Sequence, residues 1–255
     1  MINEPRIEND HPRKASLEAK LSLCETVLNF TSIYITLILP RFNFNDKMKL
    51  NIDPLIADTY YHIYNRGTNS ENIFKEEKNY NFFLKKYALY IYPIAETYAY
   101  CLLKNHFHLL IRTRSEQVIL ATRNTDTNRN PTNQETASVI ISGAFASFFK
   151  SYAQSINKSQ HRTGRLFEEP FRRIEVDTDE YLLQIIKYIH HNPQTHGFVS
   201  DFKDYAHSSY ATHLLTATTK LKREQVMNLF GGKIGFVELH LEEKILKDMH
   251  LFTLE

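Results

Sequence analysis

The sequence predicts an α+β protein in which helices pack on one face of an antiparallel sheet. Segments typical of strands and helices follow one another in the order strand, helix, strand, strand, helix, strand, helix. Only Lys104-Asn105 separates the two middle strands, which predicts a hairpin. The composition, 42% hydrophobic and 13% aromatic over 255 residues, supplies enough apolar side chains for a core. This order is typical of a ferredoxin-like (RRM-like) sheet, here with a C-terminal helical extension.

The first half of the predicted domain has four regular segments. Residues 60–66 are rich in strand-forming side chains and stop at Gly67, which predicts a strand. Residues 72–92 carry apolar side chains at helical spacing up to Pro93, which predicts a long helix. The hairpin strands follow at 94–103 and 106–113, and the polar run 122–134 predicts a flexible loop.

The second half begins with a predicted helix over residues 137–156, then a basic loop over 157–170 and a strand over 171–176. Asp177 is a plausible N-cap, with Glu180 completing a capping-box-like start. The helix it opens is expected to end near Asn192, because Pro193 follows. Two further helices are expected around residues 222–230 and from about Phe236.

Composition also bounds the class of protein. A net charge of +2 excludes a globally basic nucleic-acid coat, so any polyanion site must be local. Cys24 and Cys101 have no zinc-like spacing, which indicates reduced thiols and a cytoplasmic location. The apolar run Val27–Leu39 is too short to span a bilayer as a helix, so we expect a soluble protein. We divide the chain into an extension (1–47), a catalytic domain (48–215) and a C-terminal helical extension (216–255).

The most informative run is Asn-His-Phe-His-Leu-Leu-Ile at residues 105–111. Side chains two apart on a strand leave the same face, so His106 and His108 point together while Phe107 and Leu109 pack on the other side. Two convergent neutral imidazoles can begin a divalent-metal site. Such a pair is also common as ordinary surface or half-buried histidines, so a third ligand is needed.

On the following helix, Tyr188 and Asn192 are four residues apart and share a face. Asn192 offers an amide oxygen, a hard ligand suited to Mg²⁺ or Mn²⁺, and Tyr188 offers a phenol. The alternatives stay open at this point: a helical tyrosine is usually a core residue, and an asparagine before proline is usually a C-terminal cap.

Several separated motifs occur in one order along the chain. They are Tyr61-His62-Ile63-Tyr64-Asn65-Arg66-Gly67, Lys104-Asn105-His106-Phe107-His108-Leu109-Leu110, Gly164-Arg165-Leu166-Phe167, Tyr188-Ile189-His190-His191-Asn192-Pro193, Gly197-Phe198-Val199 and Ser208-Ser209-Tyr210. Together they resemble the REP-associated tyrosine transposases, which belong to the bacterial single-tyrosine HUH transposases. The resemblance covers roughly residues 60 to 236. It departs from the family pattern at Lys104, which precedes Asn105 and stands where proline is more usual, and residues 1–47 match nothing in it.

The resemblance implies a metal-dependent enzyme that cleaves and rejoins single-stranded DNA with hairpin or repeat elements. By position, His106, His108 and Asn192 would hold Mg²⁺ or Mn²⁺, and Tyr188 would be the nucleophile. The products would be a 5′-phosphotyrosyl enzyme and a free 3′-OH. A tyrosine has a reference pKa near 10, so it needs activation by the metal or by a basic neighbour, for which Lys187, His190 and His191 are candidates.

The resemblance also implies DNA contacts in the basic loop, where Phe167 or Phe171 could stack a base. The candidate DNA-binding cations are Arg66, Lys158, Arg162, Arg165, Arg172 and Arg173. We expect no membrane partner, a monomer or homodimer, and a bacterial cytoplasmic protein associated with the nucleoid when bound to DNA. The main alternative is a sequence-specific DNA-binding protein of the same fold with weak or no catalysis. A two-histidine hydrolase of small substrates lacks the further ligands such sites need.

Overall fold

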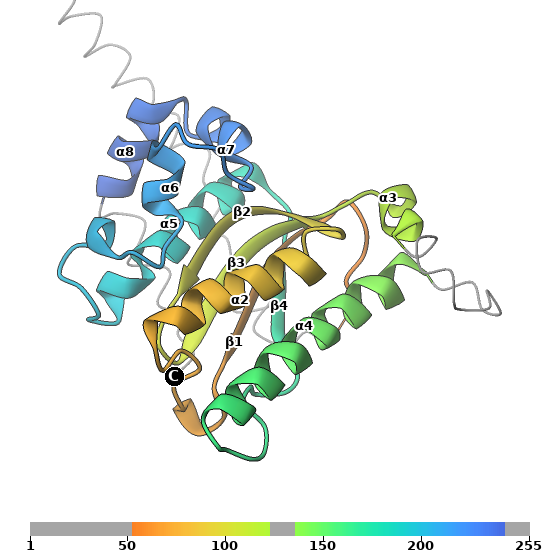
Figure 1. Cartoon of the computed structure of the whole chain (residues 1–255). Coiled ribbons are helices and arrows are strands. Elements are labelled where there is room, and N and C mark those ends of the chain that lie inside the picture. Colours follow the sequence, from red (N-terminus) through yellow and green to blue (C-terminus); the bar gives the residue numbers. More distant parts are fainter. Residues whose placement is uncertain (1–52, 123–135, 243–255) are drawn as a thin grey trace, which may run out of the picture. The chain divides into compact units, whose positions relative to one another are not determined.

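Four strands of the described residues form one antiparallel sheet in the order β2-β3-β1-β4. The structure, a computed structural model, describes residues 53–122 and 136–242 (Figure 1). The strands are β1 (Tyr60–Arg66), β2 (Ala95–Leu102), β3 (His106–Thr113) and β4 (Arg172–Val176). The helices are α2 (Glu77–Tyr90), α3 (Glu116–Ala121), α4 (Ala137–Ser159), α5 (Asp179–Thr195), α6 (Tyr210–Leu214), α7 (Arg223–Leu229) and α8 (Lys233–Leu241), with 3-10 turns η2 (Thr68–Ser70) and η3 (Phe202–Asp204). The order of the elements and of the strands confirms the predicted ferredoxin-like α+β fold with C-terminal helices.

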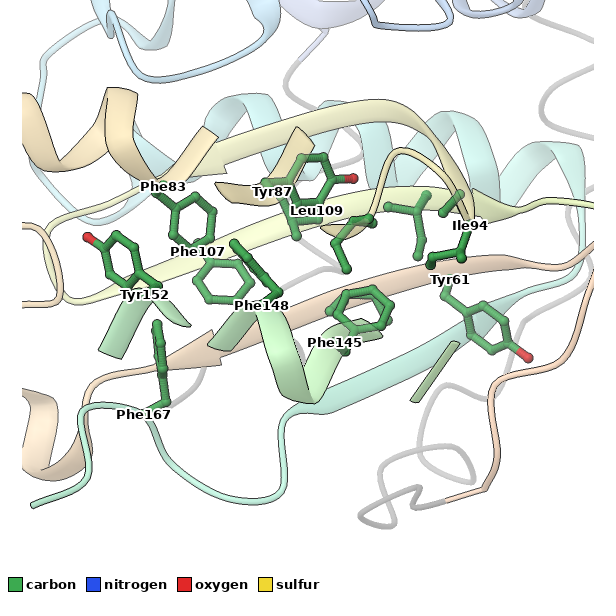
Figure 2. Packing of buried hydrophobic residues seen from close by; sticks show 14 of the residues in the cluster. Tyr61, Phe83, Tyr87, Ile94, Phe107, Leu109, Phe145, Phe148, Tyr152 and Phe167 are labelled. Carbon is green, nitrogen blue, oxygen red and sulfur yellow. The ribbon is translucent and has the colours of Figure 1, made fainter. Parts of the chain in front are cut away.

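One face of the sheet is covered by α2 and α4 (Figure 1). Odd-numbered residues of β3 point to this face, and Phe107 is fully buried there. Its ring centroid lies 5.1 Å from that of Phe83 on α2. Phe148 and Tyr152 of α4 also pack against Phe83, with ring centroids 4.9 and 5.1 Å away (Figure 2). This aromatic layer is the core that fixes the strand carrying the two histidines.

The opposite face of the sheet is crossed by α5, which packs on β2 and β3 (Figure 1). The register of β1 against β3 pairs Tyr64 with His108 and Arg66 with His106. Residues paired in this way point to the same side of the sheet. The even-numbered positions of both strands, which include His62, Tyr64, His106 and His108, therefore lie on one surface beneath α5.

The end of α5 differs from the prediction. The helix does not stop near Asn192 but continues through Pro193 to Thr195. Proline removes one helical N–H, but its fixed φ is itself compatible with a helix. The carbonyls of Asn192 and Pro193 accept hydrogen bonds from the N–H groups of His196 and Phe198, at 3.0 and 2.8 Å. These bonds close the last turn in spite of the proline.

Helix starts were also displaced from their predicted positions. The N-cap of α5 is Thr178 rather than Asp177, and its hydroxyl accepts from the Tyr181 N–H at 3.1 Å. Helix α2 begins later than predicted, where Glu76 and Asn79 form a reciprocal capping box. The short helices α3 and α6 were not predicted, because segments of five or six residues leave too few periods to recognise.

Gly67, at the end of β1, lies against backbone rather than in a turn that needs positive φ. A Cβ at this position would overlap the carbonyl oxygen of Glu71. The Asn-Arg-Gly run thus ends in glycine because two stretches of backbone approach closely there.

The predicted extension 1–47, the apolar run Val27–Leu39 and most of the predicted loop 122–134 lie outside the described residues. Within the described ranges, no helix is long and apolar enough to cross a membrane.

Candidate active site

The two histidines of β3 lie on the face beneath α5, as the strand periodicity predicted. His106 is 6% exposed and His108 1%. A third imidazole joins them from β1, since His62 Nε2 lies 2.9 Å from His108 Nδ1. Burial lowers the pKa of His62 to about 3 and that of His108 well below its usual value. The pair is therefore neutral at neutral pH. The sequence analysis gave His62 no role. Because His62 and Tyr64 are two residues apart on β1, their side chains point to the same face of the sheet.

Both ring nitrogens of His106 face amide oxygens. Its Nδ1 lies 2.8 Å from Asn105 Oδ1, and its Nε2 lies 3.2 Å from Asn192 Oδ1. Burial is the largest cause that lowers the pKa of His106, to about 4. A neutral imidazole carries only one N–H, so one of these two contacts joins a lone pair to a lone pair. A cation between the two atoms would satisfy both, and so would a turned Asn192 amide, whose buried Nδ2 has no hydrogen-bond partner among the described residues in the present orientation.

The phenol of Tyr188 lies over the same histidines. Its ring centroid is 5.4 Å from that of His108 and 5.9 Å from that of His62, in edge-to-face geometry. Burial raises the pKa of Tyr188, and a hydrogen bond with Asn192 lowers it. Because burial is the larger cause, Tyr188 is protonated at rest at neutral pH.

The donor set suits a small divalent cation. Bonds of about 2.0–2.2 Å from a metal to nitrogen and oxygen ligands separate neighbouring donor atoms by about 3.0–3.5 Å. The 3.2 Å between His106 Nε2 and Asn192 Oδ1 falls in this range. Among the described residues, no group of three or more His, Cys, Asp or Glu side chains is arranged to hold a metal. A metal site here would therefore depend on the amide of Asn192 beside His106 and His108.

A further imidazole, which sequence reasoning also missed, borders the site. His196 follows Asn192 by one helical turn, and its ring centroid lies 5.0 Å from that of His106. It is half-buried at the C-terminal end of α5. Spacing of four residues from Asn192 is the signal that would have indicated it.

The histidines next to Tyr188 in sequence are engaged elsewhere. His190 Nδ1 lies 2.8 Å from His240 Nε2, and His190 Nε2 lies 2.8 Å from Ser209 Oγ. His240 donates from Nδ1 to the carbonyl of Phe236 at 2.6 Å, and His191 donates from Nε2 to the carbonyl of His240 at 2.7 Å. These bonds fasten α5 to α8 and to the residue that precedes α6. His190 and His191 are therefore structural links rather than bases for the phenol.

Two of the predicted DNA-binding cations share the face of the histidines. Arg66 is paired across the sheet with His106, and Arg172 is paired with Tyr64. Glu168 lies between the two guanidinium groups, with oxygens 2.6 Å from Arg66 Nε and 4.0 Å from Arg172 Nη2. The structure thus brings Arg66 and Arg172 to the border of the site.

Arg173 lies on the other side of the sheet, since it is paired with Ile63. Its guanidinium carbon lies 4.7 Å from the centroid of the Phe171 ring. Phe167 is also committed to the core, at 6% exposure and 5.2 Å between ring centroids from Phe149. The idea that Phe167 stacks a base is therefore wrong for this structure.

The remaining predicted cations lie in the loop after α4. Arg162 forms an ion pair with Glu71 at 2.6 Å. Arg165 lies 3.4 Å from Glu169, but its side chain is 72% exposed. Lys158 is exposed in the last turn of α4. Lys158 and Arg165 are accessible to a polyanion, whereas the side chain of Arg162 is only 15% exposed, compared with 31% for Arg66.

Fold and site together define a class: a ferredoxin-like sheet with a His-x-His strand facing a helical tyrosine and an amide one turn further on. A protein of Haemophilus influenzae described as "Putative REP-associated tyrosine transposase" is 25% identical over 124 residues, which are 47% of this chain. The match confirms the resemblance to REP-associated tyrosine transposases indicated by the motifs. It spans 60% of that relative's length.

No family model matches the chain. A solved structure described as "Structure of the REP associates tyrosine transposase bound to a REP hairpin" aligns with a TM-score of 0.48 and 12% identity, over 65% of this chain and 84% of that chain.

Proposed function

We propose that this protein is a metal-dependent transposase or single-strand DNA endonuclease that cleaves and rejoins hairpin-forming DNA through Tyr188. One observation carries the proposal. The side chains His106, His108, Tyr188 and Asn192, from two segments some eighty residues apart, converge within one chain. The resemblance to REP-associated tyrosine transposases supports the choice of DNA hairpins as the substrate class.

His106, His108 and Asn192 would hold the divalent ion, Mg²⁺ or Mn²⁺, because two neutral imidazoles and an amide oxygen converge there. When bound, this ion would supply electrostatic stabilisation of charge that develops on the scissile phosphate.

Tyr188 would act as the nucleophile. Its phenol must lose a proton, which burial opposes and the hydrogen bond with Asn192 favours. The phenolic oxygen then forms a bond to phosphorus while the bond from phosphorus to the 3′-oxygen breaks, and the departing 3′-oxygen takes up one proton, which balances the proton lost by the phenol. The products are a 5′-phosphotyrosine and a free 3′-OH. Since the new ester conserves the phosphodiester bond, a second 3′-OH can displace Tyr188 without ATP.

Arg66 and Arg172 would position the DNA backbone beside the histidines. Both lie at the border of the site, on the face of the sheet that carries the histidines, and Glu168 holds the two guanidinium groups in place. Phosphate contacts of this kind position a nucleic acid without reading its sequence. The more exposed Lys158 and Arg165 would add contacts further along the strand.

Catalysis would take place within one chain, because Tyr188 lies over the histidines of its own sheet. Mixing Tyr188→Phe protein with His106→Ala protein tests this point. If each active site is built from one chain, the mixture remains inactive. Recovered activity would mean that helices are exchanged between copies.

Adduct formation tests the nucleophile. Incubation with single-stranded hairpin DNA and Mn²⁺ is expected to give a covalent protein–DNA adduct that Tyr188→Phe abolishes. Tyr181→Phe is the matched control, a buried tyrosine two turns earlier on α5, and Tyr64→Phe tests the other phenol near His108. An adduct that survives Tyr188→Phe and disappears with Tyr64→Phe would reassign the nucleophile. Specific binding without an adduct, under Mg²⁺ and Mn²⁺ alike, would favour the DNA-binding alternative.

A further inference from the structure

Each histidine assigned to the metal is held at its Nδ1 atom by a different neighbour. His106 Nδ1 lies 2.8 Å from the side-chain oxygen of Asn105. His108 Nδ1 lies 2.9 Å from His62 Nε2. In both rings, Nε2 is the nitrogen left to coordinate an ion.

The identity of these partners limits which ring nitrogen can carry the proton. An amide oxygen only accepts, so Asn105 favours the tautomer of His106 with hydrogen on Nδ1 and a lone pair on Nε2. Between His62 and His108 there is one proton for two facing nitrogens. When His62 accepts, His108 likewise keeps its hydrogen on Nδ1 and a bare Nε2. When His62 donates, His108 carries its hydrogen on Nε2 and cannot bind a metal.

We propose that Asn105 and His62 are positioning residues that fix the metal-binding tautomers and ring orientations of His106 and His108. This inference rests on the proposed metal site. Neither residue touches the ion in this role; each acts through the ligand to which it is bonded.

The surroundings of both residues suit such a role. His62 is fully buried, stacked on Tyr64 at 4.8 Å and edge-on to Tyr188 at 5.9 Å between ring centroids. Its ring cannot turn without disturbing these contacts. Asn105 occupies the hairpin turn immediately before His106 and is half-buried, so its side-chain oxygen is held next to the His106 ring.

Metal affinity measured without DNA tests the inference independently of cleavage. Mn²⁺ binding to the full chain can be followed by electron paramagnetic resonance of the free ion. Asn105→Ala is expected to weaken Mn²⁺ binding about 10- to 100-fold, as is usual when a partner of a ligating histidine is removed. Asn105→Asp keeps an acceptor oxygen and is expected to restore affinity. Asn72→Ala, an exposed asparagine nearby, is the control and should leave affinity unchanged.

The same measurement applies to His62. His62→Phe keeps the ring but removes the acceptor, and is expected to weaken Mn²⁺ binding by a similar factor. His62→Gln keeps an acceptor and is expected to retain more of the affinity. Thermal melting of each variant shows whether weaker Mn²⁺ binding comes with loss of the fold. If His62→Phe does not fold, the variants of half-buried Asn105 still test the proposal.

The outcomes separate the two proposals. The proposed metal site itself fails if the wild-type chain binds no Mn²⁺, or if the His106→Ala variant binds Mn²⁺ as tightly as the wild type does. If the wild type binds Mn²⁺ through His106 and folded Asn105→Ala and His62→Phe bind equally tightly, only the positioning role is overturned. Weakened binding in both, with recovery in Asn105→Asp, supports it.

Discussion

Replacing His213 by glutamine is expected to make the protein less sensitive to acid. His213 lies on α6, is 2% exposed, and donates from Nε2 to the carbonyl of Tyr98 at 2.9 Å. Burial is the largest cause that lowers its pKa, to about 4, and the nearby charge of Arg223 adds to this. A glutamine amide can donate to the same carbonyl but does not titrate in this range.

The sign and size of the effect follow from the two protonation equilibria. The folded pKa is depressed relative to about 6.5 in the unfolded chain, so the unfolded state binds the proton first as the pH falls. The contribution of neutral His213 to stability is thus complete above about pH 6.5 and is lost as the pH falls toward 4. Between pH 7 and pH 5.5, a shift of this size costs about 1.2 kcal/mol of unfolding free energy.

Urea unfolding of both proteins at these two pH values measures the difference. The wild type also contains other buried neutral histidines, such as His106 and His191, whose pKa values are lowered to about 4. Its total loss of unfolding free energy should therefore exceed the contribution of His213 alone. His213→Gln should lose about 1 kcal/mol less than the wild type over the same interval. Parallel losses in the two proteins would refute the claim that His213 stays neutral in the folded state.

Further substitutions test the core, the close approach at β1 and the DNA surface. Phe107→Ala should lower the unfolding free energy by about 3–5 kcal/mol in urea titrations, because it removes a fully buried ring, whereas exposed Leu89→Ala should change it by less than about 0.5 kcal/mol. Gly67→Ala should lower the melting temperature through backbone overlap, and an unchanged temperature would contradict that contact. Arg172→Ala and Arg66→Ala should each weaken binding to single-stranded hairpin DNA and reduce the salt dependence by about one counterion in fluorescence titrations. Equal salt slopes in wild type and variants would exclude phosphate contacts by these arginines.

Much of the site could be predicted because its parts are local. The period of two along β3 places His106 and His108 on one face of the strand. The helical period places Tyr188 and Asn192 on one face of α5. The same strand rule implies that Arg172 and Arg173 point to opposite sides. Which of them meets the histidines depends on how β4 pairs with β1, which the residues of β4 alone do not reveal.

Other features escaped prediction because their cause lies outside the segment concerned. Pro193 by itself indicates a helix end, yet hydrogen bonds from residues beyond it complete the last turn. From the sequence, His190 and His191 are candidate bases for Tyr188 because they are close to it along the chain. In the fold, both contact His240 of α8 instead. Phe167 was a candidate for stacking a DNA base because it is an aromatic residue in the basic loop. In the structure its ring is part of the aromatic core between the sheet and α4.

By itself, the sequence determined the order of the strands and of the longer helices, the two pairs of candidate site residues and the likeness to a transposase family. All of these follow from short-range periodicity and from motifs that are contiguous along the chain. Only the tertiary structure decided that His62 meets His108 across 46 residues and that Asn192 meets His106 across 86. Such contacts depend on strand register and on where α5 crosses the sheet, which are fixed by the packing of the whole core rather than by any one segment.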